Sequence, residues 1–101
     1  MDPMTRLKVS EQALSAICLK YGVRELALFG SIARGESVAG SDIDLLVQFN
    51  EGLPVTLITL VDLQAELEAL FARRVDLVPK NGLKPALRTE VLAEAQVLYA
   101  A

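Results

Sequence analysis

The sequence predicts an α/β (α+β) fold in which one small mixed β-sheet is flanked by helices. Three observations predict it. Apolar runs rich in strand-forming residues end at glycine, asparagine or proline; stretches with apolar residues at helical spacing separate them; and the resulting order is α-β-β-α-β-α. At 101 residues the chain can bury one modest core, so we expect a single domain over residues 1–101.

The first half of the chain begins with a helix and a strand. Ser10–Tyr21 is expected to be helical, because Ser10 suits an N-cap and Gly22 suits the residue after the helix end. Cys18 falls on the apolar face of that helix, and we interpret it as a core residue rather than a reactive thiol. Val23–Phe29 then predicts a strand that ends at Gly30.

A long polar loop joins this strand to the next one. The loop, Gly30–Ser41, contains three glycines and three serines, and the second strand is expected over Asp42–Phe49. A dozen residues are too many for a tight hairpin, so we expect the loop to have a function.

The second half predicts a long helix, a short strand and a third helix. The long helix is expected from about Pro54 to Ala72, the strand over Arg74–Val78, and the third helix from about Leu83–Pro85 onward. The expected buried stripe of the long helix comprises Leu57, Leu60, Val61, Leu67, Leu70 and Phe71. Residues 95–101 fit either an extension of the third helix or a short edge strand.

Composition excludes several classes of protein. A net charge of −3 and a pI near 4.9 argue against broad electrostatic binding of nucleic acid, so no direct nucleic-acid partner is expected. With no histidine and one cysteine, an ordinary zinc site is excluded, and a metal would have to be held by oxygen, as Mg²⁺, Mn²⁺ or Ca²⁺ are. The sequence has no signal-peptide pattern or membrane span, and its single cysteine fits a reducing compartment. We therefore expect a cytoplasmic protein without membrane contact.

Three aspartates fall within predicted strands. Asp42 and Asp44 are two residues apart, so their side chains should point to the same face of the sheet. If the second and third strands are neighbours, Asp76 can face the same cleft and complete an oxygen site for two Mg²⁺ ions about 4 Å apart. The alternative for all three is an exposed strand face, and for an Asp-x-Asp pair also structural calcium.

Gly30 and Ser31 lie where the first strand ends. Gly30 allows close approach of a ligand to the backbone, and the Ser31 hydroxyl and neighbouring N–H groups can donate to a phosphate. A short helical turn beginning at Ser31 would favour the same anion, and Arg34 is near enough in sequence to reach it. Gly-Ser pairs mostly mark turns, and Arg34 could equally be a solvated loop residue.

Taken together, these residues resemble a known signature. Gly30-Ser31, ten intervening residues and Asp42-Ile43-Asp44 resemble the nucleotidyltransferase superfamily, which shares its palm with DNA polymerase β and kanamycin nucleotidyltransferase. The longer motif, residues 29–35 and 41–45, resembles the smallest branch of this superfamily, the minimal nucleotidyltransferase (MNT) domain. Val75–Val78 and Val97–Tyr99 extend the resemblance over nearly the whole chain.

The resemblance implies a palm-like fold with ATP as substrate. It implies two Mg²⁺ ions held by Asp42, Asp44 and Asp76, and a nucleoside triphosphate held by Gly30 and Ser31, with Arg34 as a further nucleotide-binding residue.

The resemblance also implies a partner. Members of this branch are commonly antitoxins of helical HEPN-domain RNase toxins, and the activity proposed for the family transfers AMP from ATP to a tyrosine hydroxyl of that toxin. Asp76 would then accept the proton of the acceptor or hold the catalytic metal. Lys80 could steady phosphate charge, although a surface lysine also explains it.

Two other functions are compatible with the sequence. A non-catalytic antitoxin would block the toxin by complex formation alone, although three clustered carboxylates favour an enzyme. An RNA-modifying transferase is disfavoured by the acidic pI and the lack of a nucleic-acid domain. Apolar residues of the long helix or of the C-terminal segment could form a homo- or hetero-oligomer interface, and core packing explains them equally well.

Overall fold

The computed structural model describes residues 9–33, 35 and 42–101. In chain order its elements are α2 (Glu11–Tyr21), β1 (Val23–Phe29), α3 (Gly30–Ala33), β2 (Ile43–Phe49), α4 (Leu57–Phe71), β3 (Val75–Pro79), the 3₁₀-helix η1 (Lys80–Gly82), α5 (Pro85–Glu94) and β4 (Gln96–Ala100). None of the helices in these residues has the length and apolar character needed to cross a membrane.

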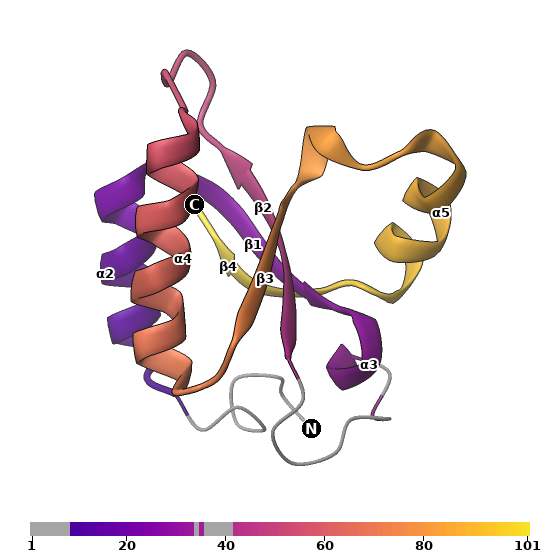
Figure 1. Cartoon of the computed structure of the whole chain (residues 1–101), viewed down its shortest axis with the longest axis horizontal. Coiled ribbons are helices and arrows are strands. Elements are labelled where there is room, and N and C mark those ends of the chain that lie inside the picture. Colours follow the sequence, from indigo (N-terminus) through magenta and orange to yellow (C-terminus); the bar gives the residue numbers. More distant parts are fainter. Residues whose placement is uncertain (1–8, 34, 36–41) are drawn as a thin grey trace.

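The four described strands form one mixed sheet in the order β3-β2-β1-β4 (Figure 1). β1 pairs antiparallel with both β2 and β4, whereas β2 pairs parallel with β3. A parallel pair needs a long connection, and α4 provides it between β2 and β3. The predicted small mixed sheet flanked by helices is therefore confirmed.

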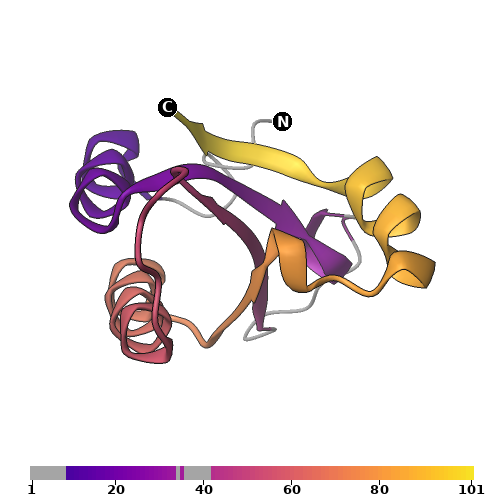
Figure 2. The same ribbon diagram turned by 90° about the horizontal axis from the view of Figure 1, so that it is seen from above.

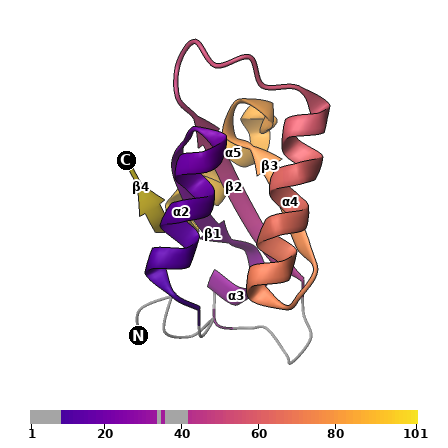
Figure 3. The ribbon, with the colours of Figure 1, turned by 90° about the vertical axis from the view of Figure 1, so that its left-hand side faces the viewer.

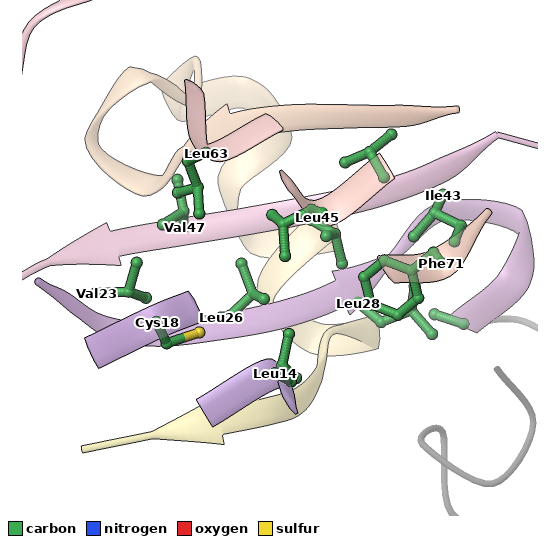
Figure 4. Close-up of a cluster of buried hydrophobic side chains, with 13 residues drawn as sticks. Leu14, Cys18, Val23, Leu26, Leu28, Ile43, Leu45, Val47, Leu63 and Phe71 are labelled. Carbon is green, nitrogen blue, oxygen red and sulfur yellow. The ribbon is translucent and has the colours of Figure 1, made fainter. Parts of the chain in front are cut away.

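Helices lie on both sides of this sheet. α2 and α4 lie side by side over one face, and α5 lies on the other side (Figures 2 and 3). The core fills the space between the sheet and the α2–α4 pair, with Cys18 of α2 among its fully buried side chains (Figure 4). Its largest fully buried side chains are Leu14, Leu26, Leu28, Ile43, Leu45, Leu63 and Leu67.

The predicted boundaries of the first helix are confirmed by its caps. The Ser10 hydroxyl accepts a hydrogen bond from the Ala13 N–H, and Gly22 has the left-handed backbone that ends the helix. β1 has the predicted bounds, and β2 begins one residue later than predicted, at Ile43.

The long helix differs from the prediction in its start and in its buried face. Thr56 and Thr59 form a reciprocal capping box, so α4 begins at Leu57 and not near Pro54. Leu57 and Val61 are 76% and 57% exposed, whereas Leu63, which the predicted stripe omitted, is fully buried. The predicted stripe was therefore wrong at Leu57 and Val61, because the α4 residues that face the core are those near Leu63, Leu67 and Phe71.

The C-terminal residues form a strand. β3 spans Val75–Pro79, so it begins and ends one residue later than predicted, and α5 begins at Pro85, within the predicted range. Ala95 ends α5 with an extended backbone, and β4 then pairs with β1. Of the two alternatives for the tail, the edge strand is correct.

Candidate active site

The predicted neighbours Asp44 and Asp76 lie side by side on adjacent strands. In the parallel pair of β2 and β3, Asp44 is the register partner of Asp76. Ile43 and Leu45, on either side of Asp44, are fully buried in the core, so Asp44 points to the opposite face of the sheet. Asp44 is half-buried and Asp76 is exposed, which places two carboxylates together at an accessible surface.

Asp42 lies immediately before β2 and is exposed. The Ile43 N–H, next to it in sequence, donates a 2.8 Å hydrogen bond to the Arg74 carbonyl, so β2 and β3 are already joined between Asp42 and Asp44. All three predicted carboxylates therefore belong to the same end of the β2–β3 pair.

Two side chains of α4 hold β3 in this position. The Gln64 side-chain amide donates to the Val75 carbonyl, and the Glu68 carboxylate accepts from the Val75 N–H, both at 2.9 Å. Val75 directly precedes Asp76, so these bonds fix the backbone that carries this carboxylate. Sequence reasoning missed Gln64 and Glu68 as positioning residues, because nothing in the sequence shows that α4 lies along the outer edge of β3.

Gly30 brings the backbone of α3 against Asp44. It has a φ of +76°, and a β-carbon added to it would overlap the Asp44 carboxylate. The preceding residue, Phe29, is the register partner of Asp44 on the β1 side. A residue with a side chain cannot occupy this position unless Asp44 moves, which gives a physical reason for the glycine.

Some of the predicted phosphate-binding residues lie within the described residues and one does not. Ser31 is in α3, the short helical turn that the sequence suggested after β1, and Arg34 lies outside the described residues. α3 is anchored by Gln96 at the start of β4, whose side-chain amide donates a 2.9 Å hydrogen bond to the Ala33 carbonyl. Sequence reasoning did not identify Gln96, because the 63 residues between donor and acceptor leave no local pattern.

Lys80 lies away from the carboxylate end. It is the first residue of η1, and its ammonium group lies 3.8 Å from the Glu25 carboxylate. Glu25 pairs with Gln48 near the other end of β2. This position does not place Lys80 beside Gly30 and Ser31.

The donor set suits a hard cation that also binds phosphate. Over the described residues, no three acidic, cysteine or histidine side chains stand close enough together to enclose a metal ion. Mg²⁺ does not require such a cage, because it is usually held by one or two carboxylates, several waters and substrate phosphates. Asp44 and Asp76, with Asp42 two residues before Asp44, therefore fit Mg²⁺ if a nucleotide supplies the remaining oxygens.

Comparison with known proteins identifies the family of this chain. A family model described as a nucleotidyltransferase domain matches residues 10–98. The protein adenylyltransferase MntA of Thermococcus cleftensis is 47% identical over 75 residues, which are 74% of this chain and 74% of that protein.

Solved structures are similar as well. A structure described as a candidate minimal nucleotidyltransferase has a TM-score of 0.74 and 43% identity and covers 95% of both chains. A Shewanella oneidensis structure of an MNT antitoxin in complex with a tri-AMPylated HEPN toxin has a TM-score of 0.64. The match covers 90% of this chain and 70% of that chain, and the sequence identity is 20%, so this similarity shows the fold alone.

Proposed function

Since this chain belongs to the nucleotidyltransferase domain family, as its motifs indicated, we propose that it transfers AMP from ATP to a tyrosine hydroxyl of a partner protein. The relatives named protein adenylyltransferases support an enzyme of this class. The observation that carries the proposal is the register pairing of Asp44 with Asp76, at the end of the sheet where Gly30 approaches Asp44.

The proposed reaction is an in-line displacement at the α-phosphorus. The tyrosine oxygen forms a bond to this phosphorus, the bond to the β-phosphate oxygen breaks, and pyrophosphate leaves. Asp76, which is exposed beside Asp44, accepts the proton of the hydroxyl. Backbone N–H groups at Gly30 and Ser31, together with the Ser31 hydroxyl and Arg34, hold the triphosphate.

Asp42, Asp44 and Asp76 would hold Mg²⁺ as two ions. Bound there, Mg²⁺ would lower the pKa of the acceptor hydroxyl and neutralise charge on the phosphates. The half-buried position of Asp44 next to the Gly30 backbone favours this use, because it keeps that carboxylate close to the phosphate-binding turn.

The proposed acceptor is a helical HEPN toxin, which this chain would neutralise as an antitoxin in the cytoplasm. The support is the fold shared with an MNT antitoxin that was solved together with an AMPylated HEPN toxin. The buried single thiol, Cys18, is compatible with a reducing compartment.

The test is one incubation of the purified chain with α-labelled ATP, Mg²⁺ and the product of the neighbouring gene, which we expect to be the toxin. We expect label on the partner with the unaltered chain and none with Asp42→Asn or Asp44→Asn. Asp62→Asn, an exposed aspartate of α4, is the matched control and should label the partner normally. If Asp44→Asn binds and silences the toxin as well as the unaltered chain does, and neither transfers label, the chain is a non-catalytic binding antitoxin.

A further inference from the structure

A pocket of about 620 Å³ opens at the end of the sheet remote from the three carboxylates. Its lining residues come from the ends of β2 and β3, the loop before α4, the first turn of α4, η1 and α5. Figure 1 shows where these elements lie in the fold. Neither the carboxylates nor Gly30 line it, so the pocket is separate from the proposed phosphate site.

This pocket has basic side chains in its lining. Lys80 and Arg88 line it together with the amides of Gln48 and Asn81, and no acidic side chain of the described residues takes part. Lys80 is partly compensated by Glu25 at 3.8 Å, whereas Arg88 forms no ion pair with any residue that the structure describes. The whole chain carries a net charge of −3, so the charge of this lining is opposite in sign to that of the chain as a whole.

The rest of the lining is mainly apolar. Leu53 and Val55 of the loop before α4 contribute to it with Phe49, Leu60 and Pro79, and both loop residues are more than a third exposed. We name this cavity the basic pocket. Its chemistry suits a ligand that carries both carboxylates and aliphatic or aromatic groups.

The position of the basic pocket relative to the carboxylates indicates which reactant it receives. Gln48 follows Asp44 by four residues on β2, so it points to the same face of the sheet at a distance of about 13 Å. β1 runs antiparallel to β2, which puts Gly30 beyond Asp44 in the opposite direction. The Asp44–Asp76 pair therefore lies between the proposed phosphate turn and the basic pocket.

In-line displacement requires the attacking oxygen and the leaving pyrophosphate to lie on opposite sides of the α-phosphorus. With the β- and γ-phosphates held at Gly30 and Ser31, the acceptor must arrive from the side of Gln48. A peptide in extended conformation covers the 13 Å to the pocket with about four residues.

We propose that the basic pocket binds an acidic segment of the acceptor protein, about four residues from the modified tyrosine, with an apolar side chain seated against Leu53 and Val55. This inference rests on the proposed function for the identity of the acceptor. It assigns Arg88 and Lys80 to acceptor binding and not to the nucleotide.

The test is the charge reversal Arg88→Glu, with Lys84→Glu as the matched control. Lys84 belongs to the same segment but does not line the pocket. Binding of the expected toxin, the product of the neighbouring gene, is measured by calorimetry without ATP, and the KM values for toxin and for ATP are measured separately. Circular dichroism melting of each variant checks that it is folded.

We expect Arg88→Glu to weaken binding of the toxin by about tenfold or more and to raise the KM for the toxin to match. The KM of Arg88→Glu for ATP should stay within about twofold of that of the unaltered chain. Lys84→Glu should keep its toxin binding and both of its KM values within the same range. The inference is overturned if folded Arg88→Glu binds the toxin as tightly as the unaltered chain does. It is also overturned if the KM for ATP rises instead, or if the unaltered chain does not bind the toxin. Because calorimetry needs no catalysis, loss of binding without any label transfer would retain the acceptor pocket and refute the proposed transferase.

Discussion

Gly30 and Asp44 are so close that no side chain fits between them. A β-carbon on Gly30 would overlap the Asp44 carboxylate, and the glycine backbone has a φ of +76°. Two separate constraints, one conformational and one steric, therefore act at the same residue.

Gly30→Ala separates these constraints when it is compared with Gly52→Ala. Gly52 has a φ of +79°, but a β-carbon there would meet no atom within 4 Å. Gly52→Ala should lose about 1–2 kcal/mol of unfolding free energy in urea titrations, because alanine is strained at positive φ, and Gly30→Ala should lose at least as much. Only Gly30→Ala should lose AMP transfer, by about 100-fold, since Asp44 must move. Equal activity of the two variants would contradict the expectation that a β-carbon on Gly30 displaces a catalytic Asp44 carboxylate.

Divalent cation binding should depend on the nucleotide. Asp44 and Asp76 offer too few ligands to hold Mg²⁺ tightly by themselves, so phosphate oxygens must complete its coordination. We expect Mn²⁺, used as a spin probe, to bind weakly without ATP and much more tightly with it. Asp76→Asn should reduce the increase in Mn²⁺ affinity that ATP causes. Tight Mn²⁺ binding in the absence of nucleotide would contradict this expectation.

Gln96→Met tests the anchor of α3. The substitution keeps side-chain length but removes the donor to the Ala33 carbonyl, and a hydrogen bond of this kind is worth about 1 kcal/mol. We expect the KM for ATP to rise about fivefold while the KM for the acceptor protein stays constant. Val97→Ala, at an exposed position of the same strand, should change neither. If Gln96→Met changes only the melting temperature and not the KM for ATP, the role of Gln96 is purely structural.

Cys18 should be unreactive in the folded protein. Burial raises the pKa of its thiol to about 12, so almost no thiolate is present at pH 8.5. Iodoacetamide should modify Cys18 only after denaturant is added, which mass spectrometry detects directly.

The same shift in pKa gives a dependence of stability on pH. The unfolded thiol loses its proton near pH 9, whereas the folded thiol keeps it to about pH 12. The stabilisation is therefore complete below pH 9 and is lost as the pH rises toward 12. The unfolding free energy of Cys18→Ala should fall less steeply over this range, and parallel curves would contradict the assignment.

Leu67→Ala and Leu57→Ala compare the two faces of α4. Leu67 is fully buried, and its truncation should cost about 2–5 kcal/mol of unfolding free energy. Leu57 is 76% exposed, so the same change should cost about 0.5 kcal/mol or less. Chemical denaturation of both variants measures the difference.

Local patterns in the sequence predicted most of the fold. Ser10 and Gly22 define α2, and the alternation of Ile43, Asp44 and Leu45 predicts which side chains of β2 face the core. Patterns failed where a contact distant in sequence decides the outcome. Leu57 and Val61 have the spacing of a buried face, but they are exposed, and Leu63 is buried beside the correctly predicted Leu67.

The residues of the site show the same difference between local patterns and distant contacts. The spacing of Gly30-Ser31 and Asp42-x-Asp44 is visible in one stretch of sequence, whereas the proximity of Asp76 requires the parallel register of β2 and β3. Gln64, Glu68 and Gln96 act through contacts to the backbone of other elements, so their residue types alone could not reveal them.

The pairing of β4 with β1 has a consequence for synthesis on the ribosome. A nascent chain emerges N-terminus first, so β1 and α3 leave the exit tunnel long before residues 96–100. Until then β1 has an unpaired edge, and α3 lacks its hydrogen bond to Gln96. We therefore expect a purified chain that ends at residue 94 to bind ATP more weakly than the chain of 101 residues.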